Sequence, residues 1–317
     1  MGKVAFIFPG QASQYSGMGK ELADKFSGAR AVFDEADKTL GFAVSKLCFE
    51  GTEDDLKLTA NTQPAILAVS VAALRVLAEK GMTPDYVAGH SLGEYSALVA
   101  AGSLSFADAV KLVRKRGTYM QEAVPAGQGS MAAIMGLAPT VVLDVCKHAA
   151  QGEVCSPANL NSPEQTVISG HAGAVKRAVE IASQSGAKRA VVLAVSAPFH
   201  CALMMPAQQR LEKDLASTKF ANLRMPLVTN VDADTITAGE EASSALVRQV
   251  TMPVRWEESM RLLLDEGVNT FVEVGPGKVL TGLIRQIERS VTTLNVEDEK
   301  SLAATLDRIT GAKTDAA

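Results

Sequence analysis

Ser91 has the strongest context for a nucleophile in this chain. It is the centre of Gly89-His90-Ser91-Leu92-Gly93, which follows a short apolar strand at residues 86–88 and precedes a helix-forming segment. A G-x-S-x-G turn between strand and helix holds its serine on a sharp elbow with the hydroxyl exposed. The free N–H groups and the positive dipole end of the helix that starts at Leu92 would then face the serine, where an oxyanion forms. The alternative is an ordinary glycine-rich turn, because the pentapeptide alone is not specific.

A nucleophilic serine needs a base, and the chain has four histidines. His90 adjoins the serine on the predicted turn, where neighbouring side chains diverge, so we expect a structural role for it. His148 and His171 lie in or beside predicted surface helices and are expected to be solvated. His200 lies in a loop after a predicted strand, and such loops carry catalytic imidazoles to other elements. We therefore predict His200 as the base, with a packed histidine as the alternative.

No carboxylate stands out as the third member of a serine–histidine–acid triad. Asp144, Glu153 and Glu164 precede His200, but all three fall in a segment that we predict to be a separate inserted unit. A backbone carbonyl can also fix the tautomer of an imidazole. The group that orients His200 therefore stays open.

Arg116 lies on a predicted helix at residues 105–123, which opens with the capping box Ser105-x-x-Asp108. At about 100° per residue, Arg116 borders the apolar stripe of this helix while its other cations face away. A guanidinium at the edge of an apolar face should meet a carboxylate or a phosphate, because its fork suits bidentate pairing. That partner is either a substrate group or a carboxylate of the protein itself.

Two further segments lie at the predicted sheet edge that carries the serine. Pro9-Gly10-Gln11 leaves the first strand in a tight turn. A backbone N–H of this turn could be the second oxyanion donor, which a loop near the elbow supplies in hydrolases. Gln63 before Pro64 opens a helix near the same edge and would, alone, be an ordinary helix-start residue.

The elements that must position these residues alternate as in an α/β fold with a parallel sheet. Two continuous apolar strands, at residues 4–8 and 86–88, indicate a sheet covered on both faces, and a late strand at residues 271–274 is expected to return to the same domain. Residues 131–195 follow the order strand, helix, strand, strand, helix, strand, which is the ferredoxin-like order.

We therefore predict an α/β-hydrolase-like domain with a parallel sheet at residues 1–128 and 197–317, and a ferredoxin-like domain inserted at residues 129–196. Residues 239–244 are predicted to be a loop, and the tail after Thr314 is predicted to be frayed.

Length and composition indicate a globular chain with a large core. Its 317 residues are 47% hydrophobic and 21% charged. A net charge of −4 and a pI near 5.7 give no general attraction to nucleic acid or to an anionic membrane, so we expect neither as a partner. The apolar helix at residues 63–80 is interrupted by Arg75 and Glu79 before it reaches bilayer-spanning length, so we predict no membrane segment. The four cysteines lack a C-x-x-C spacing, which indicates neither a zinc site nor a disulfide framework and fits a reducing cytoplasm.

Six separated motifs together resemble the malonyl-CoA:acyl carrier protein transacylases. They occur in the order of that family and span nearly the whole chain: Pro9-Gly10-Gln11, Thr62-Gln63-Pro64-Ala65, Gly89-His90-Ser91-Leu92-Gly93-Glu94-Tyr95, Arg116-Gly117 with Met120, Pro198-Phe199-His200 and Val274-Gly275-Pro276-Gly277. The resemblance implies ping-pong transfer of malonyl from malonyl-CoA to the phosphopantetheine thiol of acyl carrier protein, for fatty acid synthesis. It implies no metal and no permanently bound cofactor. One departure is Ala12, where many relatives carry glycine; we expect little consequence, because the change matters only at positive φ.

The resemblance also implies a role for each matching residue. Ser91 would be the nucleophile that malonate acylates, His200 would be its base and later its acid, and Arg116 would bind the malonyl carboxylate. The other roles concern the surroundings of these three residues. The backbone N–H groups of Gln11 and Leu92 would form the oxyanion hole, and Gln63 would line the malonyl site. The main-chain carbonyl of Gln249 would orient His200, and Phe199 would exclude acyl groups with an α-methyl branch.

The carrier protein implied by the resemblance is strongly acidic, whereas this chain is itself net negative. Docking then needs a local cationic patch, and our candidates are Lys188, Arg189 and Arg285, called the docking cations below. Their alternative is to be solvated surface charges. Three other functions stay open: a discrete acyltransferase of polyketide synthesis, a serine thioesterase or esterase with a triad acid, and an inactive module that binds carrier protein.

Overall fold

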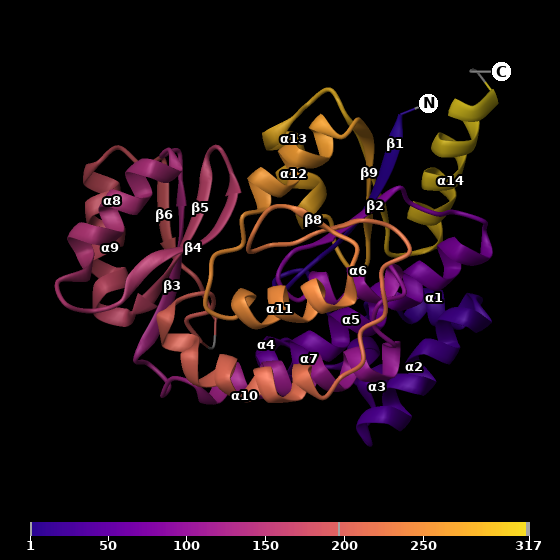
Figure 1. Ribbon diagram of the computed structural model, residues 1–317, viewed down its shortest axis with the longest axis horizontal. Coiled ribbons are helices and arrows are strands. Elements are labelled where there is room, and N and C mark those ends of the chain that lie inside the picture. Colours follow the sequence, from indigo (N-terminus) through magenta and orange to yellow (C-terminus); the bar gives the residue numbers. More distant parts are fainter. Residues whose placement is uncertain (1, 196, 315–317) are drawn as a thin grey trace.

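The computed structural model describes residues 2–195 and 197–314 as two units side by side, each built on its own sheet (Figure 1). The predicted fraying after Thr314 lies outside the described residues. One sheet has six strands and the other has four. The mixed α/β architecture with a parallel sheet confirms the predicted fold class.

The large sheet has the strand order β10-β9-β1-β2-β7-β8. All neighbouring strands are parallel except β7 and β8. The predicted strands lie within β1, β2 and β9, whereas β7, β8 and β10 were not predicted. The bounds are β1 Lys3–Phe8, β2 Tyr86–Gly89, β7 Leu227–Val228, β8 Thr235–Ile236, β9 Val268–Val274 and β10 Thr292–Val296.

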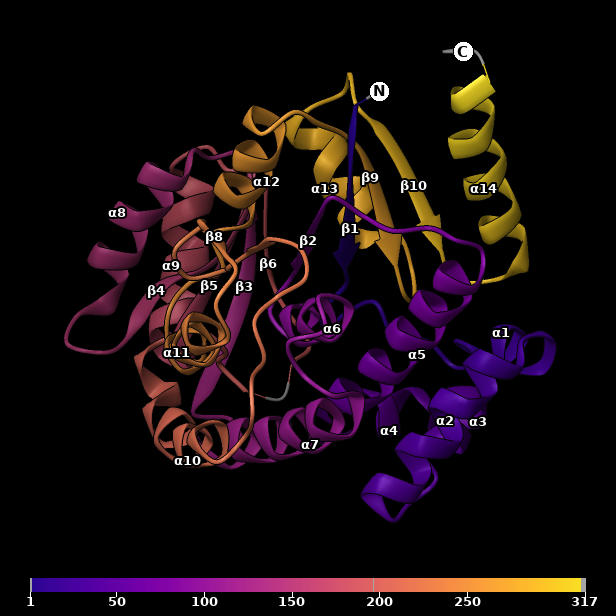
Figure 2. The ribbon, with the colours of Figure 1, turned by 45° about the vertical axis from the view of Figure 1, so that its right-hand side comes forward.

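Alternation along β1 shows how both faces of this sheet are covered. Phe6 and Phe8 belong to the core cluster that the helices α5, α6 and α7 complete, while Ala5 and Ile7 belong to a second cluster on α12 and α13. Figure 2 shows α12 and α13 on one side of β1 and β9, with α5 and α6 below them. These helices are α5 Thr59–Glu79, α6 Gly93–Ala100, α7 Phe106–Glu122, α12 Trp256–Asp265 and α13 Val279–Ile287.

Helix α5 is long and apolar enough to cross a membrane by length and composition alone. However, 78% of its most apolar stretch is buried inside the structure. Packing in the core of the large unit therefore accounts for its composition.

The predicted loop at residues 239–244 is wrong, because these residues begin helix α11, Gly239–Gln249. The N–H of Ala238 donates to the Glu241 carboxylate at the start of this helix. Its buried residues then recur at helical spacing from Ala242 to Gln249. The other helices are α1 Lys20–Lys25, α2 Ser27–Leu40, α3 Val44–Glu50, α4 Glu53–Lys57, α10 Met205–Ala216 and α14 Glu299–Thr314, with a short 3-10 helix at Ala202–Met204.

The small unit confirms the ferredoxin-like order. Its antiparallel sheet runs β4-β5-β3-β6, and α8 and α9 cover one face of it. β4 continues through Asn161 and Ser162. The bounds are β3 Gly129–Met135, α8 Pro139–Ala150, β4 Cys155–Ser162, β5 Gln165–His171, α9 Ala172–Gln184 and β6 Arg189–Val192. The domain boundaries at 128/129 and 196/197 stay a prediction.

Candidate active site

Ser91 occupies a strained turn between β2 and α6. Its φ of 52° lies in the left-handed region, which costs energy in any residue other than glycine. The flanking glycines permit this turn: a Cβ on Gly89 would lie 1.9 Å from the carbonyl carbon of Gly93, and a Cβ on Gly93 would lie 2.0 Å from the backbone oxygen of Phe8. The sequence motif therefore has the strand–turn–helix context that a nucleophile elbow requires.

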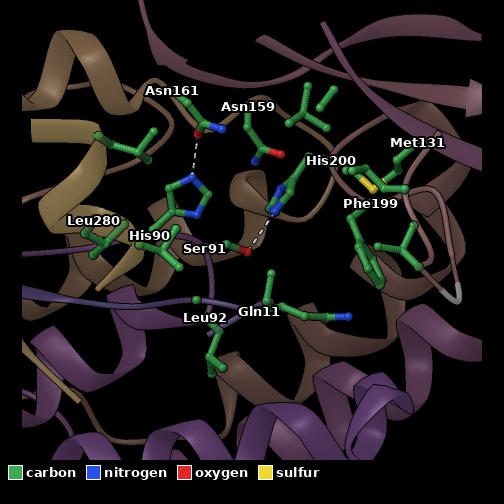
Figure 3. Close-up of a pocket in the computed structure, with 18 of the residues that line it drawn as sticks. Gln11, His90, Ser91, Leu92, Met131, Asn159, Asn161, Phe199, His200 and Leu280 are labelled. Carbon is green, nitrogen blue, oxygen red and sulfur yellow. Dashed lines mark hydrogen bonds between the residues drawn. The ribbon is translucent and has the colours of Figure 1, made fainter. Parts of the chain in front are cut away.

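The structure brings His200 to Ser91, as Figure 3 shows. The distance from Ser91 Oγ to His200 Nε2 is 2.7 Å, and His200 Nδ1 lies 2.8 Å from the main-chain oxygen of Gln249. Because a carbonyl oxygen only accepts, Nδ1 carries the proton and Nε2 is free to accept one from the serine. In the described part of the chain no carboxylate contacts this imidazole, so a backbone carbonyl orients it.

Burial, followed by the positive charge of Arg116, lowers the pKa of His200 to about 3. The imidazole is therefore neutral at neutral pH. A neutral imidazole whose Nε2 faces the hydroxyl can act as a general base.

Arg116 is buried on α7, with a relative exposure of only 2%. Its Nη1 donates to Gln63 Oε1 at 2.8 Å, and its Nη2 donates to Gln249 Oε1 at 2.9 Å and to Ser91 Oγ at 3.0 Å. Its Nε is buried without a hydrogen-bond partner. Burial lowers the pKa of Arg116. Among residues 2–195 and 197–314 no carboxylate forms an ion pair with it, so the alternative of an internal salt bridge is not realised. The site therefore holds a buried cation that no carboxylate of the described residues contacts directly.

Two backbone N–H groups remain available near Ser91 Oγ. The N–H of Ser91 itself donates to Asn230 Oδ1 at 2.6 Å, whereas those of Gln11 and Leu92 have no acceptor among the described residues. Both residues line the cavity at the serine. Both therefore stay the predicted donors of an oxyanion hole made by the elbow and a neighbouring loop.

Alanine at position 12 was expected to have little consequence unless its φ is positive, and that condition is met. Ala12 has a φ of 85°, a conformation that favours glycine. The strained residue directly follows Gln11, so alanine stores strain beside the predicted oxyanion donor.

A cavity of ≈ 310 Å³ lies between the two units and ends at these groups. The large unit contributes Gln11, Leu92 and Leu280, and the small unit contributes Met131 and Asn159, all visible around Ser91 in Figure 3. Phe199 also lines the cavity, next to His200. The cavity therefore offers a mainly apolar channel that leads to a nucleophile, a base and a cation. Within the described residues no group of three or more His, Cys, Asp or Glu side chains could hold a metal ion.

The other three histidines have mixed outcomes. His90 is partly buried, with Nε2 2.9 Å from Asn161 Oδ1, a contact that fits the expected structural role. His148 is exposed, as expected. For His171 the expectation of a solvated ring is wrong, since the ring is partly buried and its Nδ1 accepts the N–H of Val154 at 2.9 Å.

The docking cations lie on both units. Lys188 and Arg189 are exposed at the start of β6, and Lys188 pairs with Glu164 at 2.9 Å. Arg285 is exposed on α13 and its Nε donates to Thr293 Oγ1 at 3.0 Å. No contact joins the three within the described structure, so their role stays a prediction.

Sequence reasoning missed Asn230 and the site roles of Glu94 and of the Gln249 side chain. Asn230 Nδ2 donates to the Gly89 oxygen at 2.6 Å, so Asn230 fixes both sides of the elbow together with its bond to Ser91. Glu94 is buried and accepts from the Asn230 N–H, and burial raises its pKa to about 7. Only Glu94 left a signal in the sequence, because it is the single charged residue of the short helix that follows the elbow.

Comparison with known proteins agrees with this geometry. Residues 5–312 match the family model of the acyl transferase domain. The malonyl CoA-acyl carrier protein transacylase of Bacillus subtilis (strain 168) is 50% identical over 303 residues, which cover 95% of this chain and 96% of that protein. The chain belongs to the malonyl-CoA:acyl carrier protein transacylase family.

Solved structures of transacylases have the same fold. The acyl carrier protein S-malonyltransferase of Vibrio cholerae superposes with a TM-score of 0.93 at 47% identity, over 96% of this chain and 99% of that chain. A malonyl-transacylase solved in complex with the holo acyl-carrier protein of a type II polyketide synthase superposes with a TM-score of 0.94 at 46% identity, over 96% of this chain and 99% of that chain.

Proposed function

We propose that this chain transfers malonyl from malonyl-CoA to the phosphopantetheine thiol of acyl carrier protein through a malonyl-Ser91 intermediate, for fatty acid synthesis. One observation carries the choice of malonyl: Arg116 is a buried guanidinium without a carboxylate partner in the described residues, and its Nη2 lies 3.0 Å from the nucleophile. The free carboxylate of malonate supplies a carboxylate that bonds the guanidinium directly.

In the first half of the reaction, His200 Nε2 accepts the proton of Ser91 Oγ while the oxygen attacks the thioester carbon. The N–H groups of Gln11 and Leu92 stabilise the oxyanion, and His200 returns the proton to the sulfur of CoA as the C–S bond breaks. Arg116 and Gln63 hold the malonyl group in place, and Phe199 limits the space beside its α-carbon.

In the second half, the thiol of the carrier enters the same cavity and gives its proton to His200. The thiolate attacks the malonyl ester, and His200 protonates Ser91 Oγ as the ester bond breaks. The docking cations are our candidates for the surface that receives the acidic carrier. The free thiols of Cys48, Cys146, Cys155 and Cys201 fit a cytoplasmic location, which we also propose.

The carbonyl that orients His200 argues against a serine esterase or thioesterase. The hydrolase triad has a carboxylate at that position. Such an enzyme would also have no use for the buried Arg116.

A second pathway deserves a test, because the relative solved with a polyketide carrier protein has the same fold. This chain could then supply malonyl to a polyketide carrier with an unchanged mechanism. The choice depends on the acceptor and leaves the roles of Ser91, His200 and Arg116 as they are.

Mass spectrometry of the intact protein tests the proposal. Mixing with malonyl-CoA should add one malonyl group, on Ser91, and Ser91→Ala should remain unmodified. Adding a holo carrier protein of fatty acid synthesis should remove the adduct and malonylate the carrier, faster than a polyketide carrier does. If no adduct forms on Ser91, or if water removes it as fast as the carrier does, the proposed function is wrong.

A further inference from the structure

Gln249 connects the three reacting groups of the site. Its main-chain oxygen accepts from His200 Nδ1 at 2.8 Å, and its side-chain Oε1 accepts from Arg116 Nη2 at 2.9 Å. Its Nε2 donates to the main-chain oxygen of Ser91 at 3.1 Å and to Glu94 Oε2 at 3.0 Å. Both protons of this buried amide therefore have acceptors, and its oxygen is left to face the guanidinium.

Asn230 performs a similar task on the other side of the elbow. Its Oδ1 accepts the N–H of Ser91 at 2.6 Å and its Nδ2 donates to the oxygen of Gly89 at 2.6 Å. Its own backbone N–H donates to Glu94 Oε2 at 2.9 Å. A single oxygen of Glu94 thus accepts from the residue that fixes the elbow and from the residue that orients the base.

Glu94 has no role in the reaction described above, although it is fully surrounded by protein. Its relative exposure is 1%, and it forms no ion pair with Arg116 in the described structure. A buried carboxyl group is costly unless its hydrogen bonds are satisfied. The first turn of α6 places it three residues after Ser91, directly behind the nucleophile.

We propose that Glu94 is a positioning residue for acyl transfer, whose Oε2 holds Asn230 and Gln249 in register so that Ser91, His200 and Arg116 meet. This role rests on the proposed function. It predicts that a side chain at position 94 must present an acceptor at the place of Oε2, and that a negative charge there is of secondary importance.

Two variants of similar volume separate the hydrogen bonds of Glu94 from its packing. Glu94→Gln keeps an oxygen that can accept from Asn230 and Gln249, whereas Glu94→Met fills the space without an acceptor. Glu94→Asp moves the carboxylate away from Asn230 and Gln249 by one methylene, and it replaces Glu94→Met in the test if the methionine variant fails to fold. Thr305→Ala is the matched control, because it removes another buried hydrogen bond, to the oxygen of Asn295 at 3.0 Å, in α14.

Two rates are measured well below the melting temperature of each variant: labelling of Ser91 by a small fluorophosphonate, and kcat/KM with malonyl-CoA. Glu94→Met, or Glu94→Asp in its place, should lower both by about tenfold to a hundredfold, because two buried donors lose their acceptor. Both rates of Glu94→Gln should stay within about threefold of those of the unsubstituted protein, because the glutamine oxygen still accepts from Asn230 and Gln249. Thr305→Ala should lose melting temperature and keep both rates.

The idea is overturned if Glu94→Met, or its aspartate substitute, keeps both rates, or if Glu94→Gln is as slow as Glu94→Met. The fluorophosphonate arm does not depend on the identity of the acyl donor. If the unchanged protein reacts with the fluorophosphonate and forms no malonyl adduct, the proposed function fails while Glu94 is still tested.

Discussion

Replacing Arg116 by alanine tests the origin of malonyl specificity. The unpartnered Nε and the Nη2 that now bonds Ser91 Oγ give a substrate carboxylate two N–H donors. Two charge-assisted hydrogen bonds of about 1.5–2 kcal/mol each amount to about 3–4 kcal/mol. Arg116→Ala should therefore slow acylation of Ser91 by malonyl-CoA several hundredfold, at about 1.4 kcal/mol per tenfold change. Acetyl-CoA has no carboxylate, so its slow acylation should change little.

Rapid quenching followed by mass spectrometry of the intact protein measures both rates. Arg114→Ala is the matched control, since Arg114 lies on the same helix and donates to the oxygen of Ala60 and to Asn61 instead. This control should keep the ratio of the malonyl to the acetyl rate. If Arg116→Ala slows both acyl groups equally, Arg116 supports the structure of the site and does not bind the carboxylate.

Four further outcomes are expected. Phe199→Ala should raise the use of methylmalonyl-CoA relative to malonyl-CoA by about tenfold, because it opens space for one methyl group; an unchanged ratio of kcat/KM values would show that Phe199 does not limit the acyl group. Charge reversal at the docking cations should raise the KM for carrier protein and lessen its salt dependence while malonylation of Ser91 continues; an unaltered KM at low salt would place docking elsewhere. Burial raises the pKa of Glu273 to about 7, so the folded state keeps a proton that the unfolded state loses near its usual pKa, and the free energy of unfolding should fall as pH rises between these two values. Urea unfolding at pH 5 and pH 8 measures this fall, and Glu273→Gln should reduce it by up to ~3 kcal/mol. An equal fall in both proteins would contradict the prediction. Ala12→Gly should raise the unfolding free energy by about 1 kcal/mol, and an unchanged value would mean that the left-handed conformation carries no strain.

Strong local patterns explain why the sequence predicted the main elements and the central trio. The G-x-S-x-G turn needs both glycines for close approach, and the stripe on α7 places Arg116 by periodicity alone. His200 was singled out by position among four candidates, and the structure places its Nε2 2.7 Å from Ser91 Oγ, while its role as base stays a prediction. The ferredoxin-like order followed from alternating strands and helices of ordinary length. In each case the information lay within a short segment of the chain.

The missed features depend on partners that are distant in sequence. Asn230 and Gln249 meet the Ser91 backbone across 139 and 158 residues, and no local pattern marks such a contact. β7 has two residues, too few for a period to show. The start of α11 resembles a loop because glycine and serine are frequent in it, while its buried face becomes visible only over the full helix. For Ala12, the φ angle decides the outcome and is not readable from residue type.

The distance in sequence between Ser91 and its partners determines when the site can form while the chain is being synthesised. His200 leaves the ribosome 109 residues after the serine, and the central strand β1 gains its β9 neighbour only when residues 268–274 have emerged. Such non-local pairing also folds slowly. The growing chain therefore carries its serine without a base while the next 109 residues are made, so a copy that ends before His200 has no imidazole to activate Ser91 for acyl transfer.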